Sequence, residues 1–252
     1  PTEKLPYDKA GGWNGATICA KLGQNDKLEG TDSDRDRCTF ATALAAHVLM
    51  GPTACARFLV GFAGRFVEEK GFDYLFQCVP QVLAERPDAH FVFAGVREIS
   101  YEGFFERHRA EVEALADHFT FLGLLTAPQE LADFYGMIDC FALPSRSDCF
   151  PSTQIEAVRS GTPLVTADIP GAREIVRVTG MGVIVRAGDP AALAAGILEV
   201  AEQLPAYRAR QAAALAIFDP QRCFEAYEAL FTLACQQGGA SLDAAAARRI
   251  PI

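Results

Sequence analysis

Residues 140–166 read Cys140-Phe-Ala-Leu-Pro-Ser-Arg-Ser-Asp-Cys-Phe-Pro-Ser-Thr-Gln-Ile-Glu-Ala-Val-Arg-Ser-Gly-Thr-Pro-Leu-Val-Thr166, and this stretch decides the fold. It begins and ends with short apolar runs that are typical of strands. Between them lie Asp148, in a segment typical of a loop, and Glu156, in a segment typical of a helix. Two parallel strands need a long crossover connection, which is usually helical. The stretch therefore predicts one unit of a parallel α/β sheet.

The same alternation of short apolar runs and helical patterns continues on both sides of this stretch. Strands are expected at residues 58–62, 91–94, 119–122, 140–143, 164–166 and 182–185. Helices are expected at residues 72–83, 101–117, 129–135, around Glu156, and at 172–176, 190–203 and 220–231. Six strands with five crossovers predict an α/β fold, a doubly wound, Rossmann-like parallel sheet with helices on both faces.

The chain divides into three parts by composition. Residues 58–235 are expected to form the α/β domain. Residues 1–57 have no clear strand period, and we leave this irregular segment unassigned, as a remnant or a linker. Its glycines at 11–15 fit either a phosphate-facing loop or a turn. Residues 236–252 are mostly small, polar or basic and predict a flexible tail.

Composition excludes several classes of function. Half of the 252 residues are apolar, so a large buried core is available, and the formal net charge of −9 argues against a nucleic-acid partner. The longest apolar runs fall short of the roughly 20 residues that a membrane helix needs. No secretory signal is recognisable. We therefore expect a cytoplasmic protein, and peripheral contact with the inner face of a membrane stays open.

The eight cysteines show no paired short spacing, and the four histidines have no ligand at a metal-motif spacing. We expect reduced thiols, no disulfide framework and no metal site. Cofactors are likewise expected to be absent.

Two segments that follow strands could bind an anion, because open parallel sheets hold ligands beyond the carboxyl ends of their strands. The first, Gly64-Arg65-Phe-Val-Glu-Glu-Lys70-Gly71, has two cations and two glycines at the threshold of a helix and suits a diphosphate. Pairing of Arg65 and Lys70 with the acids around them is the alternative.

The second segment follows the fourth strand. Pro151 suits the first position of a helix, so the free N–H groups near residues 150–153 would form a main-chain anion site, with the hydroxyls of Ser152 and Thr153 beside it. Glu156 lies far enough into the helix to accept hydrogen bonds from the vicinal hydroxyls of a ribose. For each acid, a helix cap or an exposed helix position is the alternative.

These motifs occur in the order found in one family. Residues 58–235 resemble the C-terminal, donor-binding domain of retaining glycosyltransferases of the two-domain GT-B type. The motifs that carry the resemblance are Gly64-Arg65 with Lys70-Gly71, Phe121-Leu-Gly123, Pro144-Ser145, the pair Asp148 and Glu156 with Ala157, and Gly161-Thr-Pro-Leu-Val165.

The resemblance implies a role for each matching position. Arg65 and Lys70 would neutralise the diphosphate of a UDP-, GDP- or ADP-linked sugar, and Glu156 would bind the ribose. The backbone at Phe121, Leu122, Gly123 and Leu124 would hold the base. Asp148 would contact the transferred sugar, and Cys149, Phe150, Ser152 and Thr153 would offer N–H groups, whereas Pro151 would not. Such enzymes act without a metal and retain the anomeric configuration.

Two departures from the family pattern matter. The family usually has Glu where this chain has Asp148, and the shorter carboxylate affects the expected sugar contacts more than the diphosphate contacts. It commonly has Gly where this chain has Pro151, a mild departure because proline occurs there among relatives. Residues 1–57 are also too few for an acceptor-binding domain. We therefore expect a donor-binding half whose acceptor domain is lost or supplied by a partner chain. The alternatives are a module that only binds a nucleotide sugar, one subunit of a split enzyme, and an epimerase or phosphorylase of the same fold.

Overall fold

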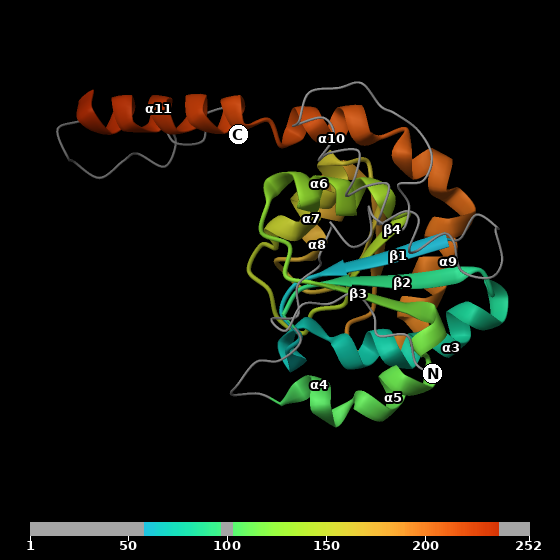
Figure 1. Ribbon diagram of the computed structural model, residues 1–252. Helices are drawn as coiled ribbons and strands as arrows, with labels where there is room; N and C mark the ends of the chain where they lie inside the picture. The colour runs from blue at the N-terminus through green and yellow to red at the C-terminus, as the bar shows by residue number, and fades with distance from the viewer. Residues whose placement is uncertain (1–57, 97–102, 237–252) are drawn as a thin grey trace, which may run out of the picture.

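The computed structural model describes residues 58–96 and 103–236, which contain a sheet of six parallel strands in the order β3-β2-β1-β4-β5-β6 (Figure 1). The strands are β1 (Phe58–Ala63), β2 (Ala89–Ala94), β3 (Phe119–Gly123), β4 (Cys140–Leu143), β5 (Leu164–Ala167) and β6 (Gly182–Val185). The helices, of which η1 and η2 are 3-10 turns, are η1 (Glu68–Lys70), α3 (Phe72–Glu85), α4 (Phe104–Arg107), α5 (Arg109–Ala114), η2 (Ala116–His118), α6 (Pro128–Met137), α7 (Ser152–Arg159), α8 (Arg173–Thr179), α9 (Pro190–Arg208), α10 (Gln211–Ile217) and α11 (Pro220–Gln236).

The doubly wound fold predicted from the sequence is confirmed. Each of the six expected strands is present, with bounds that differ by at most two residues from those expected. The proposed division at residues 57 and 235 stays a prediction, and the expectations for residues 1–57 lie outside the described residues.

Two helix predictions need correction. The single helix expected at 101–117 is divided in its described part, because His108 and Leu115 bond three residues back, to Phe105 and Val112, and leave helical dihedrals. The helix expected to end at residue 203 continues as α9 to residue 208. It bends at Gln203, where Pro205 crowds the preceding turn.

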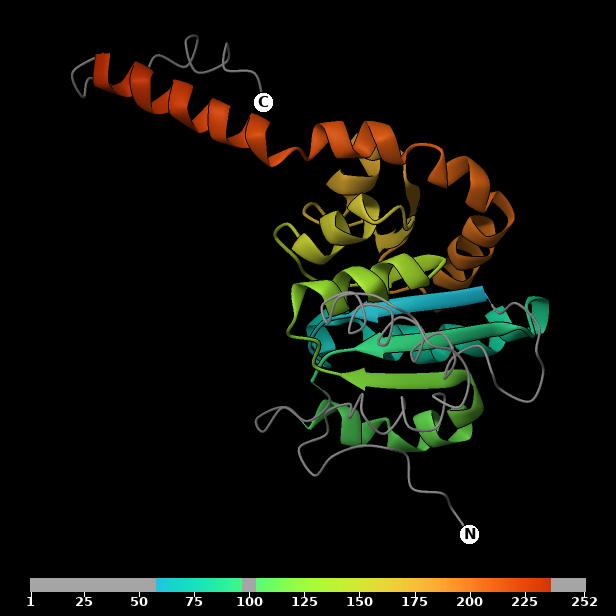
Figure 2. The same ribbon diagram turned by 45° about the horizontal axis from the view of Figure 1, so that its top comes forward.

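The two faces of the sheet carry different helices. Helix α3 packs against α9 on one face, whereas α6, α7 and α10 form the layer on the other (Figures 1 and 2). Strands β1 and β4 are neighbours in the sheet, yet α3, which follows β1, and α7, which follows β4, lie on opposite faces. The winding of the domain therefore reverses between β1 and β4, where a doubly wound sheet opens a crevice.

Phenylalanine rings fill the core beneath the loop that follows β1. Phe66, in that loop, is 1% exposed and stacks on Phe72 of α3 with 3.9 Å between ring centroids. Phe93 of β2 stacks on Phe121 of β3 at 4.9 Å. Burying a ring of this size contributes about 1.5–3 kcal/mol to folding. The loop that carries Arg65 is therefore anchored in the core by Phe66, the next residue in the sequence.

The turn before α3 requires a residue without a side chain. Gly71 has φ +70°, and a Cβ atom placed there would lie 2.1 Å from the carbonyl oxygen of Pro144, in the loop after β4. Only glycine combines this left-handed conformation with so close a backbone contact. The loops after β1 and β4 are thus held against each other.

Helix α11 projects away from the rest of the domain (Figures 1 and 2). Three of its aromatic side chains are mostly exposed: Phe224, Tyr227 and Phe231. Among the described residues, no helix is both long enough and apolar enough to cross a membrane.

Replacing Gly71 with alanine should lower the free energy of unfolding by about 3 kcal/mol, because it adds both a strained backbone and a collision with Pro144. Urea unfolding followed by circular dichroism measures this loss. Gly103→Ala is the matched control: Gly103 has φ +52°, and no atom of the described residues lies within 4 Å of an added Cβ, so we expect a loss of about 1 kcal/mol. Equal losses at the two positions would show that the collision with Pro144 does not contribute to the destabilisation at Gly71.

Candidate functional site

The loops after β1 and β4 meet at the carboxyl edge of the sheet, where the winding reverses. The backbone N–H of Arg146 donates to the carbonyl oxygen of Glu69 at 2.8 Å, which joins the loops directly. The side chain of Arg146 also donates to the carbonyl oxygen of Glu68. Residues that lie 78 positions apart in the sequence thus meet at the edge where the winding of the sheet reverses.

An ion pair joins the two predicted motifs. Lys70 Nζ lies 2.6 Å from Asp148 Oδ2, and the two side chains are only 22% and 12% exposed. Ser145 Oγ lies 3.5 Å from the same carboxylate oxygen. Lys70 therefore pairs with an acid of the opposite loop, while Asp73, an acid near it in sequence, pairs with Arg146. Arg65 lies in the β1 loop with an exposed side chain.

The start of α7 faces the same edge. Pro151 is the N-cap residue and Ser152 is the first helical residue, so the expectation of Pro151 at the first helical position is wrong by one. The reason is its extended backbone, with φ −72° and ψ 111°. Within the described residues, no hydrogen-bond acceptor is recorded for the backbone N–H groups on either side of it, those of Cys149, Phe150, Ser152 and Thr153. The main-chain donors predicted here are in position to bind an anion.

Glu156 is half-buried in α7 and is held by a residue that the sequence did not single out. The hydroxyl of Tyr135, in α6, donates to Glu156 Oε2 at 2.8 Å. Burial of Tyr135, together with the nearby negative charge of Glu156, raises the pKa of the phenol well above its usual range. The phenol therefore stays a proton donor and fixes the orientation of the carboxylate. A single tyrosine in an amphipathic helix gives no sequence signal for this role.

The glycines at the ends of β1, β2 and β3 bring three backbones together. Gly64 N–H donates to Ala94 at 2.9 Å, and Gly95 N–H donates to the carbonyl oxygen of Gly123 at 2.7 Å. The side chains of Phe121 and Leu122 pack in the core, while Leu124 is 62% exposed. Base contacts at this edge would therefore have to come from the backbone beyond Gly123.

The cysteines of the described residues are free thiols, and three of them are exposed, including Cys149 beside Asp148. Burial raises the pKa of Cys78 and Cys140, which keeps both thiols protonated. Cys19, Cys38 and Cys55 lie outside the described residues.

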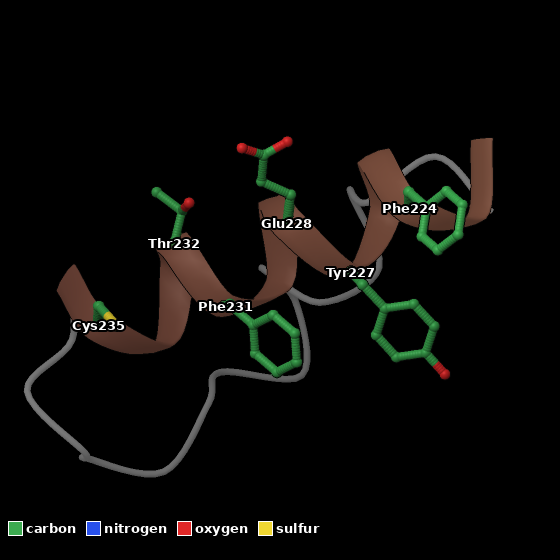
Figure 3. Close-up of a pocket in the computed structure, with 6 residues that line it drawn as sticks. All are labelled: Phe224, Tyr227, Glu228, Phe231, Thr232 and Cys235. Atoms are coloured by element: carbon green, nitrogen blue, oxygen red, sulfur yellow. The ribbon is translucent and has the colours of Figure 1, made fainter. Parts of the chain in front are cut away.

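Two apolar hollows lie apart from the ion pair. One covers the exposed side of α11, where Phe224, Tyr227 and Phe231 project from the helix (Figure 3). The other, of about 630 Å³, lies between α7 and α11 beside the end of α10, and Phe150 is among the residues that line it. Neither is lined by Lys70 or Asp148, and the segments around this ion pair at the sheet edge form the candidate site.

Fold and site together define a doubly wound α/β domain with a lysine–aspartate ion pair at the edge where its winding reverses. The chain belongs to the glycosyl transferases group 1 family, whose sequence model matches residues 57–203. The resemblance to the C-terminal domain of GT-B glycosyltransferases is thereby confirmed.

Individual relatives agree with this assignment. The D-inositol 3-phosphate glycosyltransferase of Thermobispora bispora is 33% identical over 170 residues, which are 64% of this chain and 38% of that protein. The crystal structure of HepE from Anabaena superposes with a TM-score of 0.61 at 23% identity, over 72% of this chain and 48% of that one. The C-terminal domain of a group 1 glycosyl transferase, LpcC, from Francisella tularensis gives 0.57 at 17% identity, over 64% and 85%. This chain thus spans about half the length of the full-length proteins that it matches.

The free energy of unfolding should fall with rising pH above pH 10, in part because of Tyr135. The pKa of Tyr135 in the folded protein is raised above the ordinary value of 10, so the phenol loses its proton at a lower pH in the unfolded chain than in the folded one. Below pH 10 the contribution of Tyr135 to the free energy of unfolding is complete, and above pH 10 it decreases because deprotonation stabilises the unfolded chain. The slope due to one such group reaches about 1.4 kcal/mol per pH unit. Urea unfolding from about pH 9 to about pH 11 should show a shallower fall for Tyr135→Phe. Identical slopes for the two proteins would contradict the shift.

Proposed function

We propose that this chain is the donor-binding half of a retaining glycosyltransferase that transfers a hexose from a nucleotide diphosphate sugar. The observation that carries the proposal is the ion pair of Lys70 and Asp148 beside the free N–H groups of α7, at the winding reversal of the sheet. Arg65 and Lys70 would face the diphosphate, Glu156 would accept hydrogen bonds from the ribose hydroxyls, and Asp148 would contact the sugar. HepE, which shares the fold, has been solved with UDP and glucose.

The chemistry follows from charge. A transition state with oxocarbenium character leaves negative charge on the departing diphosphate. Fixed cations and the start of a helix stabilise that charge, and they act most strongly where water is excluded. On this proposal the departing phosphate helps to deprotonate the acceptor, and neither acid acts as a nucleophile. The two cations and the α7 amides would take the place of a bound metal.

The fraction of its relatives' length that this chain covers bears on where the acceptor would bind. Because it spans about half of their length, the acceptor site would lie on a further domain or on a partner chain. A module that binds a nucleotide sugar without transferring it is the second candidate, favoured by the same coverage. An epimerase or phosphorylase of the same fold is the third candidate. The cations Arg65 and Lys70 together with the pair Asp148 and Glu156 favour the transferase, because contacts to the base and the ribose are implied as well as contacts to phosphate.

Calorimetric titration with UDP, GDP and ADP tests donor binding. We expect one of the three to bind, and Lys70→Ala or Glu156→Ala to weaken that binding by about 1.5–3 kcal/mol, the range for hydrogen bonds to charged groups. Matched controls come from elsewhere in the domain. Glu199→Ala removes an acid that accepts from Tyr207 at 2.9 Å, and Arg208→Ala removes a cation paired with Asp139 at 2.9 Å. Unchanged affinity in the first two variants would exclude those residues from the site.

The variant Asp148→Asn separates binding of the diphosphate from handling of the sugar. Removing the carboxylate frees Lys70, so the nucleoside diphosphate should bind about two- to fivefold more tightly, the small effect expected for a partly solvated charge. Sugar transfer should fall by at least about tenfold, because the sugar loses a positioning contact. Weaker nucleotide binding would instead mean that Asp148 holds Lys70 in place.

Transfer of radiolabelled sugar distinguishes the enzyme from the binding module. The chain is incubated with the nucleotide sugar whose base it binds, with and without candidate acceptor-domain chains. Transfer, or slow hydrolysis of the donor, is the outcome expected for the enzyme. Donor binding with neither reaction in any combination would leave the binding module as the function.

A further inference from the structure

Arg146, between Ser145 and Ser147 in the loop after β4, contacts both the loop after β1 and helix α3. Its guanidinium group forms a two-pronged pair with Asp73 of α3, at 2.8 Å to Oδ1 and 2.5 Å to Oδ2. It also lies over the ring of Tyr74, 4.1 Å from the centroid. The pair with Asp73 raises the pKa of Arg146, as expected for a cation held by a carboxylate.

The same residue holds the turn that ends at Lys70. The turn η1 has three residues, and Arg146 binds the carbonyl oxygens of the first two, Glu68 through its side chain and Glu69 through its backbone N–H. Lys70, the third residue, directly follows the two residues that Arg146 binds. A 3-10 turn this short has little stability of its own. Its position is therefore set from outside by Arg146.

The geometry separates this contact from an ordinary surface ion pair. Most exposed pairs contribute little, because long side chains lose entropy when they are fixed. Here the planar guanidinium fork of Arg146 binds both carboxylate oxygens of Asp73, whose side chain is 13% exposed, and the guanidinium plane lies over the ring of Tyr74. A lysine could supply the charge but neither the fork nor the stacking.

We propose that Arg146 is a positioning residue for the diphosphate of the donor, acting through the η1 turn to hold Lys70 at the crevice. This inference rests on the proposed function, since it assumes that Lys70 binds the diphosphate. Arg146 does not touch the donor itself, because its guanidinium group is engaged by Asp73, Glu68 and Tyr74.

The test is a double-mutant cycle in nucleotide binding, with UDP, GDP and ADP as probes. Arg146→Ala should raise the dissociation constant about tenfold in the wild-type background and by less than about twofold in the Lys70→Ala background, because residues that act through one another are not additive. Arg146→Lys should behave nearly as Arg146→Ala does. Equal effects in both backgrounds, or a lysine variant that binds as wild type does, would overturn the proposal in favour of direct charge or general stability.

Arg86→Ala is the matched control. Arg86 also forms a two-pronged pair, with Asp88 at 2.9 and 3.0 Å, and lies over an aromatic ring, that of Phe58, but at the amino edge of the sheet. Its loss should leave nucleotide affinity unchanged.

Hydrogen exchange of the free protein tests the positioning role of Arg146 independently of the proposed function. The amides of Lys70 and Gly71, which bond within the turn, should exchange at least about tenfold faster in Arg146→Ala than in Arg86→Ala. If the wild-type chain binds none of the three nucleotides, the proposed function fails, and the exchange rates still decide whether Arg146 holds the turn. Unchanged exchange would overturn the inference even if nucleotide binds.

Discussion

The close approach of two loops is the constraint on which the site depends. Helices α3 and α7 leave neighbouring strands toward opposite faces, so the loops that lead to them would diverge unless something joined them. Gly71 allows the first loop to rest on the carbonyl oxygen of Pro144, and the backbone bond from Arg146 to Glu69 closes the gap. The ion pair between Lys70 and Asp148 exists because of this contact.

Packing below the loops makes the site rigid before any ligand arrives. Phe66 is buried beside Phe72 and Phe93, so the β1 loop has a side chain anchored in the core immediately next to an exposed arginine. On the other side of the crevice, Tyr135 fixes Glu156 from the neighbouring helix. Charged groups held in this way need little reorganisation when a charged ligand binds, which is where a preorganised site gains affinity.

The sequence predicted the sheet well, because buried parallel strands are continuous apolar runs that stand out between helical patterns. It also singled out Lys70 and Asp148, which the structure joins in an ion pair, while the donor-binding roles of Lys70, Asp148 and Glu156 stay predictions. It could not identify Arg146 or Tyr135, whose partners lie 73 and 21 residues away and have no characteristic spacing. The helix break at His108 was missed for a related reason, because the local dihedrals there are set by the tertiary fold, whereas the break at Gln203 lies where the sequence placed the end of that helix.

The ion pair of Lys70 and Asp148 has a consequence for how fast a ligand arrives. With Lys70 compensated and a formal charge of −9 on the whole chain, the anionic donor of the proposed function would meet net repulsion at long range and attraction only close to the site. Moderate salt screens the repulsion beyond about 10 Å and leaves contacts at bonding distance much less affected. Association would then become faster as salt is added, the reverse of what electrostatic steering produces.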